Sequence, residues 1–424
     1  MASPADDVSR REWCAKIIGV GGLINSFSWT VVTTAQLGMG LRLAPSQDHL
    51  VQMTALARST AQLTAFFVLP ALGNLSDTVG RKPLLVARSC VVFVFSGLVA
   101  VAPSYKLFLL HRLVSNLTHH LVDATVQASM ADLYQGKALA SAISTLRSHM
   151  AIAMLAGPAS GGWLAERSFR LCFALSAMCG LVNALLYALV LPETMERNEA
   201  SESQPHRSYS SVNPISFLKL FGRGRALATL TVATALSEMC DGTTEIDRYY
   251  AQDVAGLSFT QNGMYQSARG LAMVLGGRLV SPILRALGTS KYTTLCNLMA
   301  AVHMLGKSLA RTPTTFFAAL VPNTLGAGSY REAALKAQLM RLALASGMTR
   351  GEVSACEANF RALLSTSAPF LYSFLYTGRV STVHRGLPYL AALALLSASH
   401  LVFCSLRAAD LGEVAARCQQ EEKS

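Results

Sequence analysis

The stretch 71-ALGNLSDTVGRKPLL-85 joins two apolar segments, at 52–75 and 83–103, each long enough to cross a bilayer. Its glycines and charged residues make the pattern G-x-x-x-D-x-x-G-R-K: Gly73, Asp77, Gly80, Arg81 and Lys82. Gly80 permits a tight turn, and the two cations favour the cytoplasmic side of a membrane. Asp77 can meet Arg81 or the N-terminus of a neighbouring helix. The pattern therefore predicts a short cytoplasmic connection between two membrane-spanning helices.

Apolar segments of spanning length recur along the whole chain. A spanning helix needs about 20 mostly apolar residues to cross about 30 Å of hydrocarbon. Twelve segments come close to this requirement: 16–38, 52–75, 83–103, 106–131, 141–164, 169–191, 226–246, 260–284, 292–310, 314–336, 353–376 and 385–406. The chain is 52% hydrophobic and only 14% charged, whereas soluble domains carry about 25% charged residues. We therefore predict an all-α membrane protein with twelve transmembrane helices, in preference to a large soluble helical protein.

Polar stretches divide these segments into two sets of six. The expected organisation is a cytoplasmic N-terminus (1–15), a six-helix bundle (16–192), a cytoplasmic linker (193–224), a second bundle (225–407) and a cytoplasmic tail (408–424). Lysine and arginine are concentrated in the connections on the side of the N-terminus, which places both termini in the cytoplasm. The polar N-terminus lacks a cleavable signal pattern, so we expect the first apolar segment to be retained as a spanning helix.

A weak internal repeat agrees with the two sets. The stretch 279-LVSPILRALGTSKYTTL-295 lies between the eighth and ninth segments, as 71–85 lies between the second and third. Gly288 corresponds to Gly80, and Arg285 stands in the place of Asp77. Two-fold internal symmetry of this kind is common in transporters.

Composition and motifs also exclude several classes of protein. The net charge of +12 comes from loops on one predicted side, which argues against a nucleic-acid partner. The nine cysteines include no C-x-x-C pair, so we expect no disulfide framework and no metal site. The chain also has no flavin fingerprint, and we expect no cofactor. The chain has no nucleophile constellation or phosphate loop, and its polar segments are too short for a catalytic domain. We therefore expect that it is not an enzyme.

Four motifs carry a family resemblance. The stretch 71–85 resembles the loop-two motif of the major facilitator superfamily, in which this loop stabilises one access state. The sequence Gly157-Pro158-Ala-Ser-Gly161-Gly162 resembles the family's helix-five antiporter signature, although a packing kink without a coupling role is an equal alternative. Leu191-Pro192-Glu193-Thr194 resembles the exit from helix six. The stretch 351–376 resembles helix eleven of the tetracycline-exporter-like drug:proton antiporters.

The resemblance implies the major facilitator fold, in which two six-helix bundles surround a cavity lined by helices one, four, seven and ten. Arg112 stands where the family's helix-four motif R-x-x-Q-G places its arginine. However, Ser115 and Asn116 replace the last two residues of that motif, which puts a proton-transfer role for Arg112 in doubt.

Polar residues inside the predicted spans are candidates for the site, because an ionisable group near the bilayer centre costs about 2.5–3.5 kcal/mol on insertion scales. Segment four has four such residues at spacings that share one helix face: Arg112, Asn116, His119 and Asp123. A carboxylate beside a histidine can exchange a proton near neutrality. Asp123 is therefore the first choice for proton coupling, and a purely structural His119–Asp123 pair is the alternative.

Other segments offer further candidates. In segment seven, Glu238 and Asp241 share a face with Glu245, which belongs alternatively to an external loop. Asn25 is a hydrogen-bonding candidate in segment one. In segment eleven, Glu357 and Arg361 are an i,i+4 pair whose charges can simply neutralise each other.

Together these features predict a monomeric secondary active transporter of a small organic solute, coupled to protons and working by alternating access. The acidic candidates favour a cationic, zwitterionic or amphipathic solute. Two alternatives stay open at this stage: a passive facilitator, and a transport-inactive receptor or scaffold with the same fold. Substrate, direction and cellular membrane are not specified by the sequence.

Overall fold

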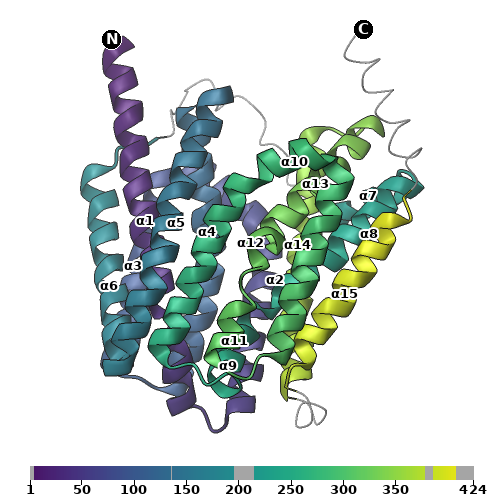
Figure 1. Ribbon diagram of the computed structural model, residues 1–424. Coiled ribbons are helices and arrows are strands. Elements are labelled where there is room, and N and C mark those ends of the chain that lie inside the picture. The colour runs from purple at the N-terminus through teal and green to yellow at the C-terminus, as the bar shows by residue number, and fades with distance from the viewer. Residues whose placement is uncertain (1–3, 135, 195–213, 378–384, 407–424) are drawn as a thin grey trace. The chain divides into compact units, whose positions relative to one another are not determined.

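A computed structural model describes residues 4–134, 136–194, 214–377 and 385–406 (Figure 1). Within these ranges it leaves some side chains undescribed: those of residues 4–8, 68–78, 120–124, 136, 137, 140, 214, 289, 328–334, 337, 350, 351 and 355. The described residues form helices and short connections and contain no strand. The chain divides into two compact units. Unit 1 comprises residues 1–211 and 258–270, and unit 2 comprises residues 212–257 and 271–424.

Unit 1 is built from six long helices, and the sixth ends in a π-helical turn. They are α1 (Pro4–Leu43), α2 (Gln47–Val79), α3 (Arg81–Val101), α4 (Tyr105–Leu133), α5 (Gly136–Arg167), α6 (Phe169–Leu185) and η1 (Leu186–Val190). The first residues of α10 (Phe259–Leu309) complete the unit. Helix α1 packs on α5 and α6, α3 packs on α6, and α2 packs on α4 (Figure 1).

Unit 2 contains shorter and more interrupted helices. They are η4 (Pro214–Leu218), α7 (Lys219–Gly222), α8 (Arg225–Cys240), η5 (Asp241–Thr243), α9 (Thr244–Asp253), the rest of α10, α11 (Pro313–Ala318), α12 (Asn323–Gly326), α13 (Gly328–Ala345), α14 (Arg350–Thr377) and α15 (Leu387–Cys404). Helix α8 is central, because α13, α14 and α15 all pack against it.

Three predicted spans of unit 2 differ in detail from single straight helices. The segment 226–246 consists of α8, η5 and α9 in succession. The segments 260–284 and 292–310 both lie in α10, which is broken by the positive φ of 73° at Gly288. The segment 314–336 is divided among α11, α12 and the start of α13. Sequence periodicity detects apolar length, whereas these breaks depend on local backbone geometry.

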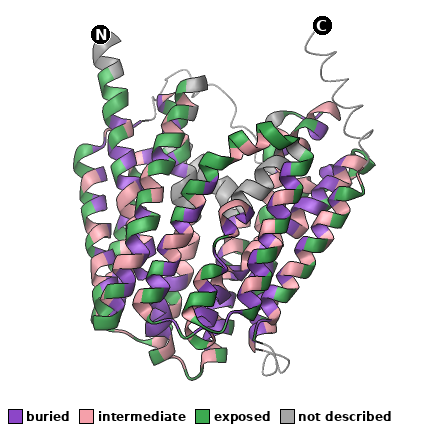
Figure 2. Cartoon of the chain, viewed as in Figure 1, coloured by how far each residue is buried: buried purple, intermediate pink, exposed green. Residues whose placement is uncertain are grey.

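Side-chain exposure fits a chain whose outer surface faces lipid. Large apolar side chains such as Phe374, Leu401 and Leu189 are exposed. Exposed positions recur along the helices of both units (Figure 2). Five described helical stretches are long and apolar enough to span a membrane: Ser9–Leu43, Arg81–Val101, Phe169–Val190, Phe259–Gly288 and Leu387–Cys404. Helices α4, α8, α13 and α14 are not among them. These less apolar helices carry most of the polar candidates.

The predicted linker, 193–224, is only partly described. Its first residues, Glu193 and Thr194, contact α3 in unit 1. Its last part forms η4 and α7, which pack on α14 and α8. Residues 195–213 lie outside the described ranges. The domain boundaries remain a prediction.

Candidate functional site

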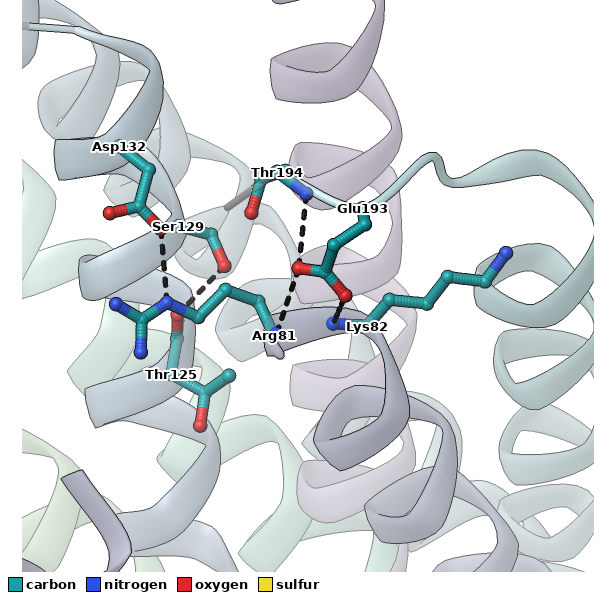
Figure 3. A network of polar contacts seen from close by, with 7 residues as sticks. All are labelled: Arg81, Lys82, Thr125, Ser129, Asp132, Glu193 and Thr194. Atoms are coloured by element: carbon teal, nitrogen blue, oxygen red, sulfur yellow. Dashed lines mark hydrogen bonds and ion pairs between the residues drawn. The ribbon is translucent and has the colours of Figure 1, made fainter. Parts of the chain in front are cut away.

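The connection between α2 and α3 is held by a carboxylate from the far end of unit 1 (Figure 3). One Glu193 oxygen, Oε1, accepts hydrogen bonds from the backbone N–H of Arg81 at 2.9 Å and of Thr194 at 3.1 Å. The other, Oε2, accepts one from Lys82 at 3.2 Å. Arg81 and Lys82 are the first residues of α3, whose N–H groups have no partner inside the helix. Glu193 therefore caps α3, and its charge also complements the helix dipole.

Gly80 is required by this geometry. Its φ of 106° lies in the region that residues with a side chain rarely adopt. A Cβ at this position would also lie 2.6 Å from Oε2 of Glu193. The turn therefore needs glycine, both for its backbone angle and for the approach of the carboxylate.

Arg81 connects the same turn to α4. Its side chain is buried, and Nε lies 3.0 Å from Oδ2 of Asp132 near the end of α4 (Figure 3). The predicted partner, Asp77, and the motif residue Gly73 lie among the undescribed side chains. Among the described residues, Asp132 pairs with the side chain of Arg81, whereas Glu193 binds the backbone N–H groups of Arg81 and Lys82. Both acids lie far from the motif in sequence.

The Gly-Pro motif of α5 brings three helices into close contact within unit 1. A Cβ at Gly161 would collide with the carbonyl of Val31 in α1, and a Cβ at Gly157 would collide with Thr30. On the other side, Gly162 faces the backbone of Phe259 in α10. Thr30 also donates a hydrogen bond to the carbonyl of Ala153 at 3.2 Å. These contacts give the small residues a clear packing role.

Pro158 is in the same contact. A Cβ at Gly263 of α10 would collide with the carbonyl of Pro158, so the two backbones approach closely. Ser267 accepts a hydrogen bond from the backbone N–H of Ala159 at 3.1 Å. At the end of α5, the N–H of Thr260 donates to Glu166 at 3.1 Å, and this bond lowers the pKa of the Glu166 carboxyl.

Two of the polar candidates of α4 contact α1. Arg112 is buried and donates a hydrogen bond to Gln36 of α1. His119 stacks on Trp29 of α1, with ring centroids 4.7 Å apart. Asn116 and Asn25 are half-buried. The side chain of Asp123 is undescribed, so the predicted His119–Asp123 pair stays a prediction.

In unit 2, four charged side chains from three helices form an ion-pair network, called the quartet below: Glu238 of α8, Lys336 of α13, and Glu357 and Arg361 of α14. Glu238 Oε1 lies 3.1 Å from Nζ of Lys336 and 2.6 Å from Nη2 of Arg361. Glu357 lies 3.6 Å from Lys336 and 4.0 Å from Arg361. Two cations and two anions give the quartet no net charge when all four are ionised.

Glu238 is the centre of the quartet. Its side chain is 14% exposed, against 46% for Arg361. Both cations contact it at shorter distances than they contact Glu357. The i,i+4 pair predicted in α14 is present, but Arg361 is bound more closely by a residue of another helix. Since Glu238 is neutralised in this way, it no longer argues for a cationic solute.

A second ion pair in unit 2 is fully buried and was not singled out from the sequence. Nζ of Lys307 in α10 lies 2.7 Å from Oδ2 of Asp247 in α9, and their side chains are 2% and 1% exposed. Tyr389 of α15 donates a hydrogen bond to the other Asp247 oxygen at 2.9 Å. An intramembrane lysine usually has an acidic partner, so Lys307 in its apolar segment was the feature of the sequence that could have indicated this pair.

Asp241 and Glu245 occupy the bend between α8 and α9. The hydroxyl of Thr244 donates to the backbone carbonyl of Asp241 at 2.7 Å. Glu245 lies in the first turn of α9 and is half-buried.

Unit 1 also has a cavity of about 350 Å³ between α1, α4 and α5. Small apolar residues and a few polar ones line it, among them Glu12, Lys16, Tyr134 and His149. The described candidates Arg112, Asn116, His119 and Asn25 lie outside this lining. Among the residues that the structure describes, no group of three His, Cys, Asp or Glu side chains is placed to hold a metal ion.

Comparison with known proteins establishes the family. The model of the Major Facilitator Superfamily matches residues 18–356. The chain belongs to this superfamily. The predicted fold, with twelve membrane-spanning helices in two six-helix bundles, is confirmed, and so is the multi-pass integral membrane character of this facilitator.

Individual relatives are distant. The chain is 25% identical over 337 residues to the Escherichia coli tetracycline resistance protein, class C; the match covers 78% of this chain and 82% of that protein. It is 23% identical over 391 residues to multidrug resistance protein 2 of Bacillus subtilis (strain 168), covering 84% and 92%. A crystal structure of the peptide transporter POT in complex with sulfate matches with a TM-score of 0.68 at 15% identity, covering 94% of this chain and 95% of that one. The resemblance to drug exporters of the superfamily is thereby confirmed.

Proposed function

We propose that this protein is a secondary active transporter of a small organic solute, coupled to protons and working by alternating access. In this proposal the protein is a monomer, both of its termini lie in the cytoplasm, and it has no enzymatic activity. It is supported by membership of the superfamily and, above all, by one structural observation. Glu238 of α8 is shared by a cation of α13 and a cation of α14.

The quartet can couple a proton to a conformational change. When Glu238 is ionised, its carboxylate holds Lys336 and Arg361 together and so links three helices. When it is protonated, it loses most of its attraction for both cations, and the quartet gains a net positive charge. A proton therefore favours an arrangement in which α8, α13 and α14 are less tightly linked. Differential proton binding by two arrangements is what lets a gradient drive transport.

The alternative proton site is Asp123, on the face of α4 that carries Arg112, Asn116 and His119. It remains the first choice from the sequence. The two sites make different predictions, because Asp123→Asn and Glu238→Gln each remove one carboxylate and leave the other.

The test is solute counterflow and solute-driven proton movement in proteoliposomes that contain the purified full chain. Solutes come from a panel of cations, zwitterions and anions screened by thermal stabilisation. We expect counterflow of a stabilising solute together with a change of internal pH. Glu238→Gln should retain counterflow and lose the pH change. The control Glu352→Gln, which removes a carboxylate of α14 outside the quartet, should keep both.

Other outcomes decide between the alternatives. Counterflow without any proton movement in the wild type would show a passive facilitator. Stabilisation by a solute without counterflow would show a receptor or scaffold. Retained proton movement in Glu238→Gln, with loss in Asp123→Asn, would move the coupling site to α4.

A further inference from the structure

An exposed cysteine in unit 2 lies beside a histidine that is itself bound by an asparagine. Sγ of Cys404, the last residue of α15, is 3.6 Å from Nε2 of His400, one helical turn earlier. The other ring nitrogen of His400, Nδ1, is 3.1 Å from Nδ2 of Asn297 in α10. Cys404 is exposed, His400 is half-buried and Asn297 is 4% exposed. A thiol, a base and a group that orients the base are the parts of an activated nucleophile.

Asn297 can determine which nitrogen of His400 carries the proton. A half-turn of its amide exchanges Nδ2 and Oδ1, and Oδ1 is buried and has no other hydrogen-bond partner among the described residues. In that orientation Oδ1 accepts a hydrogen bond from Nδ1–H, and Nε2 keeps its lone pair for the thiol proton. Asn297 is 103 positions from His400, so the sequence alone did not show this arrangement.

The thiol lies at one end of an exposed face of α15. The opposite face of this helix packs on α8. At spacings of four and three positions, the exposed face carries Leu390, Ala394, Ser397, Leu401 and Cys404. In a chain that spans a membrane, such a face contacts lipid, and Leu401 is 70% exposed. Because α15 ends at Cys404, the thiol lies where the hydrocarbon meets the lipid headgroups.

We propose that Cys404 is an S-acylation site, at which the thiol takes a long fatty-acyl chain from a coenzyme A thioester. Nε2 of His400 removes the thiol proton, and the sulfur attacks the carbonyl carbon of the thioester. A bond forms between Sγ and this carbon, the bond from the carbon to the sulfur of coenzyme A breaks, and His400 returns the proton to the departing thiolate. One thioester replaces another, and nothing is oxidised or reduced. Each chain reacts once, so the reaction is a modification of the protein and not an enzymatic turnover.

The position of Cys404 favours a fatty-acyl chain over a short acyl group. A long chain attached to Sγ can lie in the hydrocarbon along the exposed face of α15, next to Leu401. Cysteines at the membrane boundary are typical sites of reversible palmitoylation. With the C-terminus in the cytoplasm, as proposed above, the thiol also faces the compartment that contains coenzyme A thioesters.

The test is acylation of the purified full chain in lipid nanodiscs by palmitoyl-coenzyme A. Mass spectrometry locates the modified cysteine, and cleavage by hydroxylamine identifies the thioester. The matched control, Cys404→Ser combined with Ser405→Cys, moves an exposed thiol by one position, to the same depth but about 100° around the helix from His400. We expect Cys404 in the wild type to react at least about tenfold faster than the moved thiol, because only Cys404 contacts the base. Equal rates, or no acylation of Cys404, would overturn the site.

Two further comparisons test the base and its orienting group. His400→Gln removes the base and should slow acylation of Cys404 at least about tenfold. Asn297→Ala should also slow it, and Asn297→Asp, which can accept from Nδ1–H, should restore the rate; a merely structural role for Asn297 predicts no such rescue. An unchanged rate in His400→Gln would overturn the mechanism. If that variant does not fold, the moved thiol still decides, since it changes only exposed positions.

The length of the acyl chain is tested with acetyl-coenzyme A. In nanodiscs it should acylate Cys404 more slowly than palmitoyl-coenzyme A, because an acetyl group is too short to lie along the exposed face of α15. Equal rates with the two thioesters would overturn the assignment of a fatty-acyl chain. Acylation requires no solute and no flux, so these outcomes are independent of the proposed transport function.

Discussion

Removal of one partner from the Asp247–Lys307 pair should destabilise unit 2 far more than removal of both. Lys307→Met leaves a carboxylate that is 1% exposed, and Asp247→Asn leaves an ammonium that is 2% exposed. The double variant leaves no charge, and asparagine can still accept the hydrogen bond from Tyr389. The three variants therefore form a double-mutant cycle. It separates the cost of leaving a buried charge unpaired from the cost of losing the Asp247–Lys307 ion pair itself.

The magnitude follows from burial. Breaking a buried pair by removing one partner costs about 3–5 kcal/mol, whereas replacing both by neutral groups is often close to neutral. A change of 1 kcal/mol shifts the unfolding temperature of a domain of 150–250 residues by about 2–4 °C. Each single variant should therefore unfold roughly 6–20 °C below the wild type. The double variant should unfold above either single one.

The assay is thermal unfolding of the purified chain in one detergent, with Lys219→Met as the matched control. Lys219 and Glu352 are also 2.7 Å apart, but their side chains are 54% and 28% exposed. Exposed pairs contribute about 0–1 kcal/mol at most, so this variant should change little. If the losses of the two single variants simply add in the double variant, or if Lys219→Met costs as much as Lys307→Met, the reasoning from burial is refuted.

Two further predictions concern carboxylates outside the spans. Glu193→Ala should lower the unfolding temperature, with a loss of about 1–3 kcal/mol, because the first N–H groups of α3 lose their acceptor; Glu193→Gln should lose less, and an unchanged alanine variant would contradict the capping role. The hydrogen bond from Lys219 lowers the pKa of the Glu352 carboxyl below 4.5, so the stabilisation it gives is present above that pH and is lost as the pH falls through the lowered pKa. The difference in unfolding temperature between wild type and Glu352→Gln should therefore be small but measurable at pH 7, as for an exposed pair, and should vanish in acid; a difference independent of pH would contradict it.

The sequence by itself predicted the fold, because membrane insertion acts on local properties. Apolar runs of about 20 residues, the loop pattern at Gly80–Lys82 and the placement of lysine and arginine are all visible within short windows. The helix breaks in unit 2 were missed, since the break at Gly288 depends on one backbone angle and not on hydropathy.

The candidate site was predicted only in part. Glu238 and the Glu357–Arg361 pair were found, because an acid in an apolar segment and an i,i+4 spacing are both local features. The contact of Arg361 with Glu238 at 2.6 Å is shorter than its 4.0 Å contact within α14, and no spacing in the sequence indicates it. The buried pair of Lys307 and Asp247 was not predicted, because its two residues are 60 positions apart in the chain.

Only the tertiary structure showed which charged groups pair with each other. Glu193 reaches the start of α3 from the end of unit 1, and Lys336 reaches Glu238 from another helix. Such pairs form because a buried charge must find an opposite charge or a free backbone N–H when helices pack. The sequence determines that these charges lie in apolar segments and need partners. Only the packing of the helices determines the partner, because the partner is close in space and distant in the chain.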